Sequence, residues 1–187
     1  MSNTAEIYKF PEASSAEQSF EDYWEGCRQY CPEMTKGRAY QLFHMSPEEY
    51  FQNAGWVYVL ANGLMAENVF KVGRTTKNIE LRMRQLYTTG VPMEFDCMYA
   101  DWFPDCIRAE AFIHKTLEPF RISESREFFH ASINEIEWAF LTYAATGEMA
   151  PDHMVGHISA RSRHAAAHEQ VNGVLVSKKP TTLEVPF

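Results

Sequence analysis

A tyrosine and a lysine of this 187-residue chain could together perform base chemistry. Tyr58 lies in the segment GWVYVLA at 55–61 and Lys71 in NVFKVG at 68–73, and both segments have the β-branched and aromatic content of the two strands of a hairpin. Side chains alternate between the faces of a strand, so both residues are expected on one face, opposite the core-facing valines. An adjacent ammonium favours the phenolate, which would make Tyr58 a general base. The alternative is a packed tyrosine ring beside a solvated lysine.

A basic strip extends from the second strand segment into the helix that follows it. Residues 71–84 contain five basic residues, opposed only by Glu80: Lys71, Arg74, Lys77, Arg82 and Arg84. In the helix predicted over 77–87, Arg82 lies near the border of the apolar stripe, whereas Arg84 points away. The Arg82 guanidinium could hold a phosphate oxygen and stabilise a phosphoryl transition state, or it could lie along the helix as an ordinary surface arginine. Arg74, Lys77 and Arg84 are candidate substrate-binding residues.

A carboxylate lies on the apolar arc of a second predicted helix, over 104–120. Glu110 occupies this arc, with His114 one turn further along. A carboxylate there must be solvated, paired with a basic residue or bound to a metal ion. One Mg²⁺ or Mn²⁺ ion, held by Glu110 and a substrate phosphate, is one interpretation, and a salt bridge is the other. His114 could be a second base, a hydrogen-bond partner that orients Glu110, or a core histidine.

The elements that must position these residues follow from the hydrophobic pattern and the capping residues. Besides the hairpin and the helix that follows it, the pattern predicts a polar N-terminal tail, two helices before the hairpin, a third strand and two further helices: 1–15, 16–31, 46–53, 94–103, 104–120 and 132–146. The fold class is therefore α+β. Three segments are expected: an N-terminal tail with a helical extension at 1–54, a domain at 55–148, and a flexible C-terminal tail at 149–187 with a short helix near 160–170.

The formal net charge is -8, which is unusual for a protein that contacts nucleic acid. Residues 1–54 hold 4 basic and 9 acidic groups, residues 55–150 hold 9 and 13, and residues 151–187 hold 4 and 3. Phosphate contact is therefore expected at the strip from Lys71 to Arg84.

Neither a long apolar run nor a basic-then-apolar leader occurs, so a soluble, cytoplasmic protein without a membrane partner is expected. The cysteines lack paired CxxC spacing, and free thiols are predicted. Cys27, Cys31 and His44 could form a zinc site, although two loosely spaced ligands with a distant third give a weak signal.

Taken in order, these motifs resemble the GIY-YIG nuclease superfamily, in its phage-type branch. The similar segments cover about half of the chain: Trp56-Val57-Tyr58 for GIY, Lys71-Val72-Gly73 for YIG, Gly73-Arg74-Thr75-Thr76 followed by Arg82, Ala109-Glu110 with His114 and Leu117, and Arg126-Glu127-Phe128-Phe129. The chain departs from the family pattern at Trp56 and Val57, which replace Gly and Ile, and at Lys71, which replaces the tyrosine of YIG.

The resemblance implies a three-stranded antiparallel sheet flanked by helices, here with an N-terminal helical extension. It also implies a metal-dependent DNA endonuclease or nickase in which Tyr58 deprotonates water, Arg82 holds the phosphate and Glu110 binds a single Mg²⁺ or Mn²⁺ ion, while Lys71 gives electrostatic support. Branched or modified DNA is included among the expected substrates. The alternative is a catalytically inactive module that binds nucleic acid or protein on the same fold, and residues 16–54 could dock a protein partner.

Overall fold

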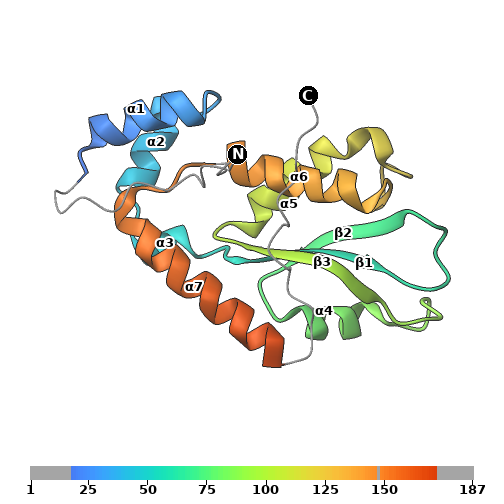
Figure 1. The fold of residues 1–187 in the computed structure, drawn as a ribbon. Helices are drawn as coiled ribbons and strands as arrows, with labels where there is room; N and C mark the ends of the chain where they lie inside the picture. The colour runs from blue at the N-terminus through green and yellow to red at the C-terminus, as the bar shows by residue number, and fades with distance from the viewer. Residues whose placement is uncertain (1–17, 147, 172–187) are drawn as a thin grey trace, which may run out of the picture.

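The computed structural model describes residues 18–146 and 148–171 and has an antiparallel sheet at its centre (Figure 1). The strands are β1 (Gly55–Ala61), β2 (Val69–Thr75), β3 (Asp96–Phe103) and β4 (Phe128–His130), in the order β3-β1-β2-β4. The expected α+β fold with helices around a small antiparallel sheet is confirmed, except that the sheet has four strands where three were predicted.

The β1–β2 hairpin has the predicted alternation of side chains. Tyr58 pairs with Gly73, and Leu60 pairs with Lys71. The valines of β1 belong to one hydrophobic cluster together with Val72, while Tyr58 and Leu60 belong to a second cluster on the opposite face. The predicted assignment of the hairpin side chains to the two sheet faces is therefore confirmed.

The additional strand, β4, leaves one end of β2 uncovered by a strand. It pairs with β2 from Val69 to Lys71, and the Val72 N–H donates to the Glu127 carbonyl oxygen at 3.1 Å. Beyond that point, among the described strands, Gly73–Thr75 pair with β1 alone. Side chains from the two faces of the sheet can therefore approach each other around this open edge of β2.

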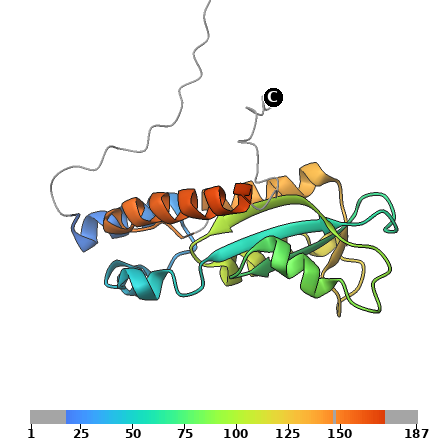
Figure 2. The same ribbon diagram turned by 90° about the horizontal axis from the view of Figure 1, so that it is seen from below.

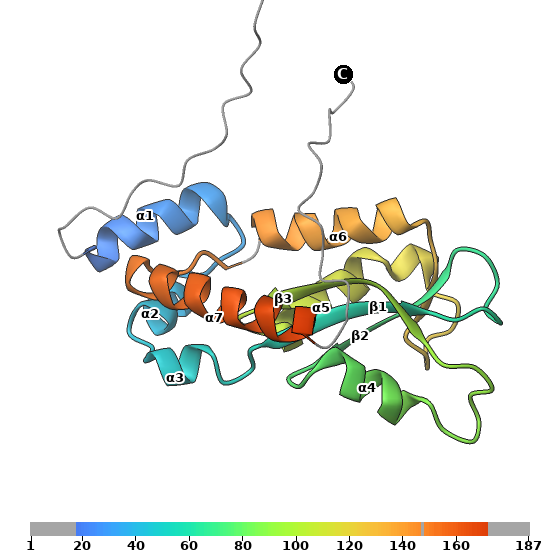
Figure 3. The same ribbon diagram turned by 60° about the horizontal axis from the view of Figure 1, so that its bottom comes forward.

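Helices cover both faces of the sheet (Figures 2 and 3). Helices α5 (Cys106–Thr116) and α6 (Ile133–Thr146) cover the face that carries Val57 and Val59. Helices α4 (Ile79–Leu86) and α7 (Asp152–Val171) cover the other face, where Ile79 and Ala165 pack against the cluster that contains Tyr58. Each β1 side chain except that of Ala61 is therefore buried.

Three short helices precede the hairpin: α1 (Phe20–Tyr30), α2 (Lys36–Phe43) and α3 (Pro47–Tyr50). They enclose a third cluster, and the Tyr23 hydroxyl donates to the Met149 carbonyl oxygen at 2.6 Å. Helices α1 and α3 were predicted. Helix α2 was not predicted; it is short, and its eight residues KGRAYQLF include a glycine, which has low helix propensity.

The capping boxes predicted at Ser46 and Ser132 are confirmed by reciprocal contacts with Glu49 and Glu135. A 3-10 turn, η1 (Glu118–Phe120), follows α5. Helix α7 is longer than the short helix expected near 160–170. The tail predicted at 1–15 and the end of the chain from 172 lie outside the described residues. The division at 54 and 148 stays a prediction.

None of the four cysteines forms a disulfide in the structure. Cys27 and Cys31 are buried among the N-terminal helices, and the described part of the chain has no group of three His, Cys, Asp or Glu side chains placed to hold a metal ion. No helix within residues 18–146 and 148–171 has the length and apolar character needed to cross a membrane.

Candidate active site

A pocket of about 320 Å³ opens at the end of β2 where the two sheet faces meet. It is lined by nine residues from β1, β2, the β2–α4 loop, α4, α5 and the residue before β4: Tyr58, Arg74, Thr75, Thr76, Lys77, Arg82, Gln85, Glu110 and Glu127. Five of the eight predicted site residues are among them. Lys71, Arg84 and His114 are not.

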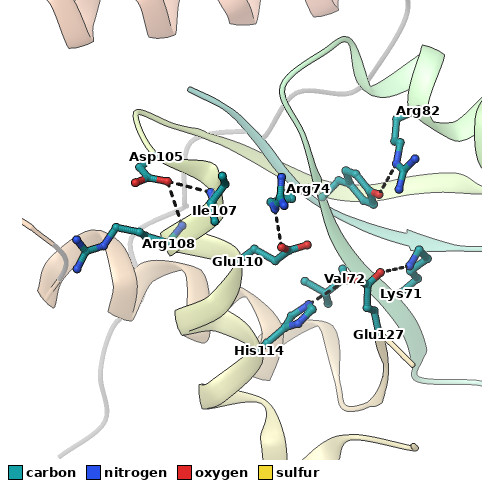
Figure 4. Close-up of polar contacts among 11 residues, drawn as sticks. Lys71, Val72, Arg74, Arg82, Asp105, Ile107, Arg108, Glu110, His114 and Glu127 are labelled. Atoms are coloured by element: carbon teal, nitrogen blue, oxygen red, sulfur yellow. Dashed lines mark hydrogen bonds and ion pairs between the residues drawn. The ribbon is translucent and has the colours of Figure 1, made fainter. Parts of the chain in front are cut away.

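Tyr58 reaches this pocket because Gly73 has no side chain. The Tyr58 ring lies across Gly73, where an added Cβ atom would meet the phenol oxygen at 2.8 Å. The ring itself is almost fully buried, with 1% of the residue exposed. Arg82 Nε donates a hydrogen bond to the Tyr58 hydroxyl oxygen at 3.2 Å (Figure 4). The Asn78 side chain caps the start of α4 by accepting from the Leu81 N–H at 3.0 Å. The capped helix places Arg82 beside the Tyr58 hydroxyl.

The cation beside the phenol is Arg82, which corrects the expectation that Lys71 fills this position. Burial raises the pKa of Tyr58 above its ordinary value of 10.0, and Arg82 opposes this shift by favouring the phenolate. Tyr58 is therefore a neutral phenol at neutral pH. Lys71 shares the sheet face of Tyr58, but its register position is opposite Leu60, two residues from Gly73.

Lys71 has a different partner, Glu127. Its Nζ atom lies 2.5 Å from Glu127 Oε2 and 5.5 Å from the centroid of the Phe128 ring. This ion pair lowers the pKa of Glu127 below its ordinary range, although burial acts in the opposite direction. Glu127 lines the pocket, and its ion pair holds the Lys71 ammonium next to the pocket. Sequence reasoning assigned Glu127 no role; its place in the segment Arg126-Glu127-Phe128-Phe129 was the one available signal.

Glu110 enters the pocket from the opposite side of the sheet. Helix α5 covers the face of Val57, but Glu110 reaches round the end of β2, where Arg74 Nε donates to Glu110 Oε2 at 2.8 Å (Figure 4). Burial raises the pKa of Glu110, while His114 and Arg74 act to lower it. The salt bridge weighed as an alternative for Glu110 is therefore present, and it lies within the pocket.

A comparison with known protein families matches the part of the chain that holds this pocket. Residues 55–142 match the T5orf172 domain. The match covers less than half of the chain and includes every residue that lines the pocket. It indicates a nuclease-like or DNA-binding module. No curated protein and no solved structure matches the chain.

The other predicted site residues within the matched segment lie outside the pocket. His114 Nε2 is 3.0 Å from the Val72 carbonyl oxygen, and its ring centroid lies 5.1 Å from that of Phe129. His114 therefore binds the backbone of β2, and its proximity is one of the effects that lower the pKa of Glu110. Arg84 forms an ion pair with Glu80 one turn earlier on α4, and its side chain is largely exposed.

The carboxylates of the pocket could supply one or two oxygens to a single hard cation. Glu110 and Glu127 are the carboxylates of the pocket, and each uses its Oε2 atom in an ion pair. Magnesium characteristically keeps several waters and takes one or two carboxylates together with substrate phosphates. Glu110 is thus suited to contribute one oxygen to such an ion, with Arg74 competing for the carboxylate.

Proposed function

We propose that the chain is a DNA endonuclease or nickase whose active site is the pocket at the end of β2. The observation that carries the proposal is the convergence of a phenol, two arginines and a carboxylate: Tyr58, Arg82, Arg74 and Glu110 all line one pocket of about 320 Å³. A general base, cations for a phosphate and a hard metal ligand are the groups that phosphodiester hydrolysis requires. The match to the T5orf172 domain supports the same conclusion.

The cations of the pocket bind the scissile phosphate in this proposal. Arg82 and Arg74 face the pocket from α4 and β2, and Lys77 adds an exposed ammonium at its rim. A phosphate that enters competes with Glu110 for Arg74, which frees carboxylate oxygen for the metal ion. Planar guanidinium groups suit the non-bridging oxygens, on which negative charge grows in the transition state.

Tyr58 accepts the proton of the attacking water. In the fraction of molecules in which Tyr58 has lost its proton, a fraction that rises with pH, the water proton passes to the phenolate oxygen as the water oxygen forms its bond to phosphorus. The leaving oxygen departs with the electrons of the broken P–O bond. Arg82 stabilises the phenolate through the bond it already makes to that oxygen. A Mg²⁺ or Mn²⁺ ion on Glu110, when bound, supplies a Lewis acid for the phosphate oxygens and for the water.

Plasmid cleavage tests the proposal. The full chain is incubated with supercoiled plasmid, single-stranded DNA and branched DNA in Mg²⁺ or Mn²⁺, beside Tyr58→Phe and Glu110→Gln. Two matched controls are Tyr40→Phe, an exposed tyrosine of α2, and Glu118→Gln, which also pairs with an arginine but lies outside the pocket. We expect loss of cleavage in the first two variants and wild-type rates in the controls. Cleavage that survives both pocket substitutions would exclude these roles.

A catalytically inactive DNA-binding module is the second candidate function. The Arg74–Glu110 ion pair favours it, because a carboxylate held by an arginine already has a structural role. The raised pKa of Tyr58 favours it as well, since a neutral phenol is a poor base. DNA binding without cleavage of any of the three substrates would support this candidate and reject the nuclease.

A further inference from the structure

Strand β2 carries one basic residue on each of its faces near the pocket, and each of them binds a carboxylate from a neighbouring segment. Arg74 shares the sheet face of Val57, and its Nε atom donates to Glu110 Oε2 at 2.8 Å. Lys71 lies on the opposite face, and its Nζ atom is 2.5 Å from Glu127 Oε2. The two ion pairs thus reach the pocket from the two sides of the sheet, and both carboxylates line it.

Each of these carboxylates keeps one oxygen atom that the two cations do not use. Arg74 and Lys71 bind the Oε2 atoms, and in the part of the chain that the structure describes neither Oε1 atom takes part in a hydrogen bond or an ion pair. Figure 4 shows both carboxylates in the space between Arg74 and Lys71. Burial and the negative charge of Glu127 both raise the pKa of Glu110, so the two anionic groups repel each other across the pocket.

The exposure of the two side chains suits an ion that keeps part of its water. The Glu110 side chain is 17% exposed and the Glu127 side chain is 49% exposed, so Glu127 is the carboxylate with more access to solvent. The backbone fixes Glu127 beside β2, because its carbonyl oxygen accepts from the Val72 N–H at 3.1 Å. Magnesium keeps several waters and takes one or two carboxylates in proteins, and manganese accepts the same oxygen ligands.

We propose that Glu127 is the second carboxylate of the cation site, so that Glu110 and Glu127 together hold the Mg²⁺ or Mn²⁺ ion. The inference rests on the proposed function for the presence of the ion. A cation beside both Oε1 atoms offsets the repulsion between the two carboxylates. The ion pairs occupy only the Oε2 atoms, so the ion can reach both Oε1 atoms before DNA binds.

Metal binding by the full chain without DNA tests the inference. Mn²⁺ is titrated into the wild type, Glu127→Gln and Glu110→Gln, and the free ion is measured by electron paramagnetic resonance. We expect each substitution to weaken Mn²⁺ binding about tenfold, because it removes one of the two charged ligands. Glu118→Gln is the matched control, since Glu118 also pairs with an arginine but lies outside the pocket, and it should bind Mn²⁺ as the wild type does.

Glu127→Asp separates coordination of the ion from an effect of charge alone. It keeps the negative charge but draws the carboxylate back by one methylene group, and we expect it to lose most of the affinity that Glu127→Gln loses. The backbone contact with the Val72 N–H survives both substitutions, so both variants should fold, which circular dichroism checks.

Three results would overturn the inference: no Mn²⁺ binding by the wild type, equal affinities for Glu127→Gln and Glu118→Gln, or wild-type affinity in Glu127→Asp. The proposed active site fails separately, if Tyr58→Phe and Glu110→Gln cleave plasmid like the wild type. Weakened Mn²⁺ binding by Glu127→Gln and Glu110→Gln would still establish the cation site in that case.

Discussion

Gly73 sets the position of the Tyr58 hydroxyl. Its missing side chain leaves room for the phenol, and a Cβ atom there would lie 2.8 Å from the hydroxyl oxygen and 3.0 Å from two ring carbons. These atoms belong to a buried ring, so an added methyl group must displace either the ring or the backbone of β2. A side chain at position 73 would thus displace the Tyr58 hydroxyl relative to β2.

Gly73→Ala should therefore abolish most of the cleavage activity while the chain still folds. We expect a rate close to that of Tyr58→Phe and a loss of about 1–3 kcal/mol in the free energy of unfolding. Single-turnover cleavage and denaturant melts measure the two effects. Gly90→Ala is the control, because nothing lies within 4 Å of its added Cβ. A Gly73→Ala protein that cleaves at the wild-type rate would contradict the placement of Tyr58.

The pH dependence of cleavage follows from the burial of Tyr58. Burial raises its pKa above 10.0, so the phenolate fraction grows tenfold for each unit of pH across the neutral and mildly alkaline range. The rate should rise with pH up to about pH 9 with a slope of up to 1 on logarithmic axes. The residual activity of Tyr58→Phe should lack this slope. A wild-type rate that is flat over this range would argue against Tyr58 as the base.

At the scale of elements, the sequence predicted what depends on a local period and missed what depends on distant partners. The hairpin, its alternation and the capped helices follow from patterns of two and 3.6 residues. Strand β4 has three residues, too few to show alternation, and forms because it meets the edge of β2. The same applies to the site. Arg82 and Glu110 were singled out from their positions on helix faces. The ion pairs Arg74–Glu110 and Lys71–Glu127 were not predicted, because they join segments 36 and 56 residues apart.

Helix α4 positions Arg82, so the Asn78 cap should affect catalysis. Asn78→Ala removes the acceptor for the Leu81 N–H and should cost about 1 kcal/mol of stability. Fraying of the first turn of α4 displaces Arg82, and we expect cleavage to fall about tenfold. Ser19→Ala removes the corresponding cap of α1 and should cost similar stability with no loss of cleavage. Equal rates in the two variants would show that α4 does not position the site.

At the scale of the whole molecule, one carboxylate joins the N-terminal helices to the domain that holds the pocket. Arg38 of α2 binds Glu148 through Nε at 2.8 Å and Nη2 at 2.9 Å, and Arg108 of α5 binds the same carboxylate at 2.5 Å. Two larger hollows, of about 710 and 570 Å³, flank this cluster and share its three residues. The charged groups that the two hollows share are thus paired with one another. A protein partner for residues 16–54 stays a prediction.

Glu148→Gln should loosen this junction without affecting the pocket. The carboxylate is half-buried between two arginines, so its loss leaves positive charge without compensation. We expect a loss of about 1–3 kcal/mol in the free energy of unfolding, measured by urea melts, with wild-type cleavage below the transition. The exposed Glu25→Gln on α1 should leave stability unchanged. An unchanged Glu148→Gln melt would mean that the ion pairs of Glu148 do not stabilise this junction.

The central claim is that Tyr58 and Glu110 act as one catalytic unit in the pocket at the end of β2. The most direct test is a double-mutant cycle on single-turnover cleavage of duplex DNA, with Tyr58→Phe, Glu110→Gln and the combined variant. Groups that act as a unit are strongly non-additive, so each single variant should lose at least about a hundredfold and the combined variant should be no slower than the slower single variant. Single losses that multiply in the combined variant, or cleavage that persists in it, would contradict the claim.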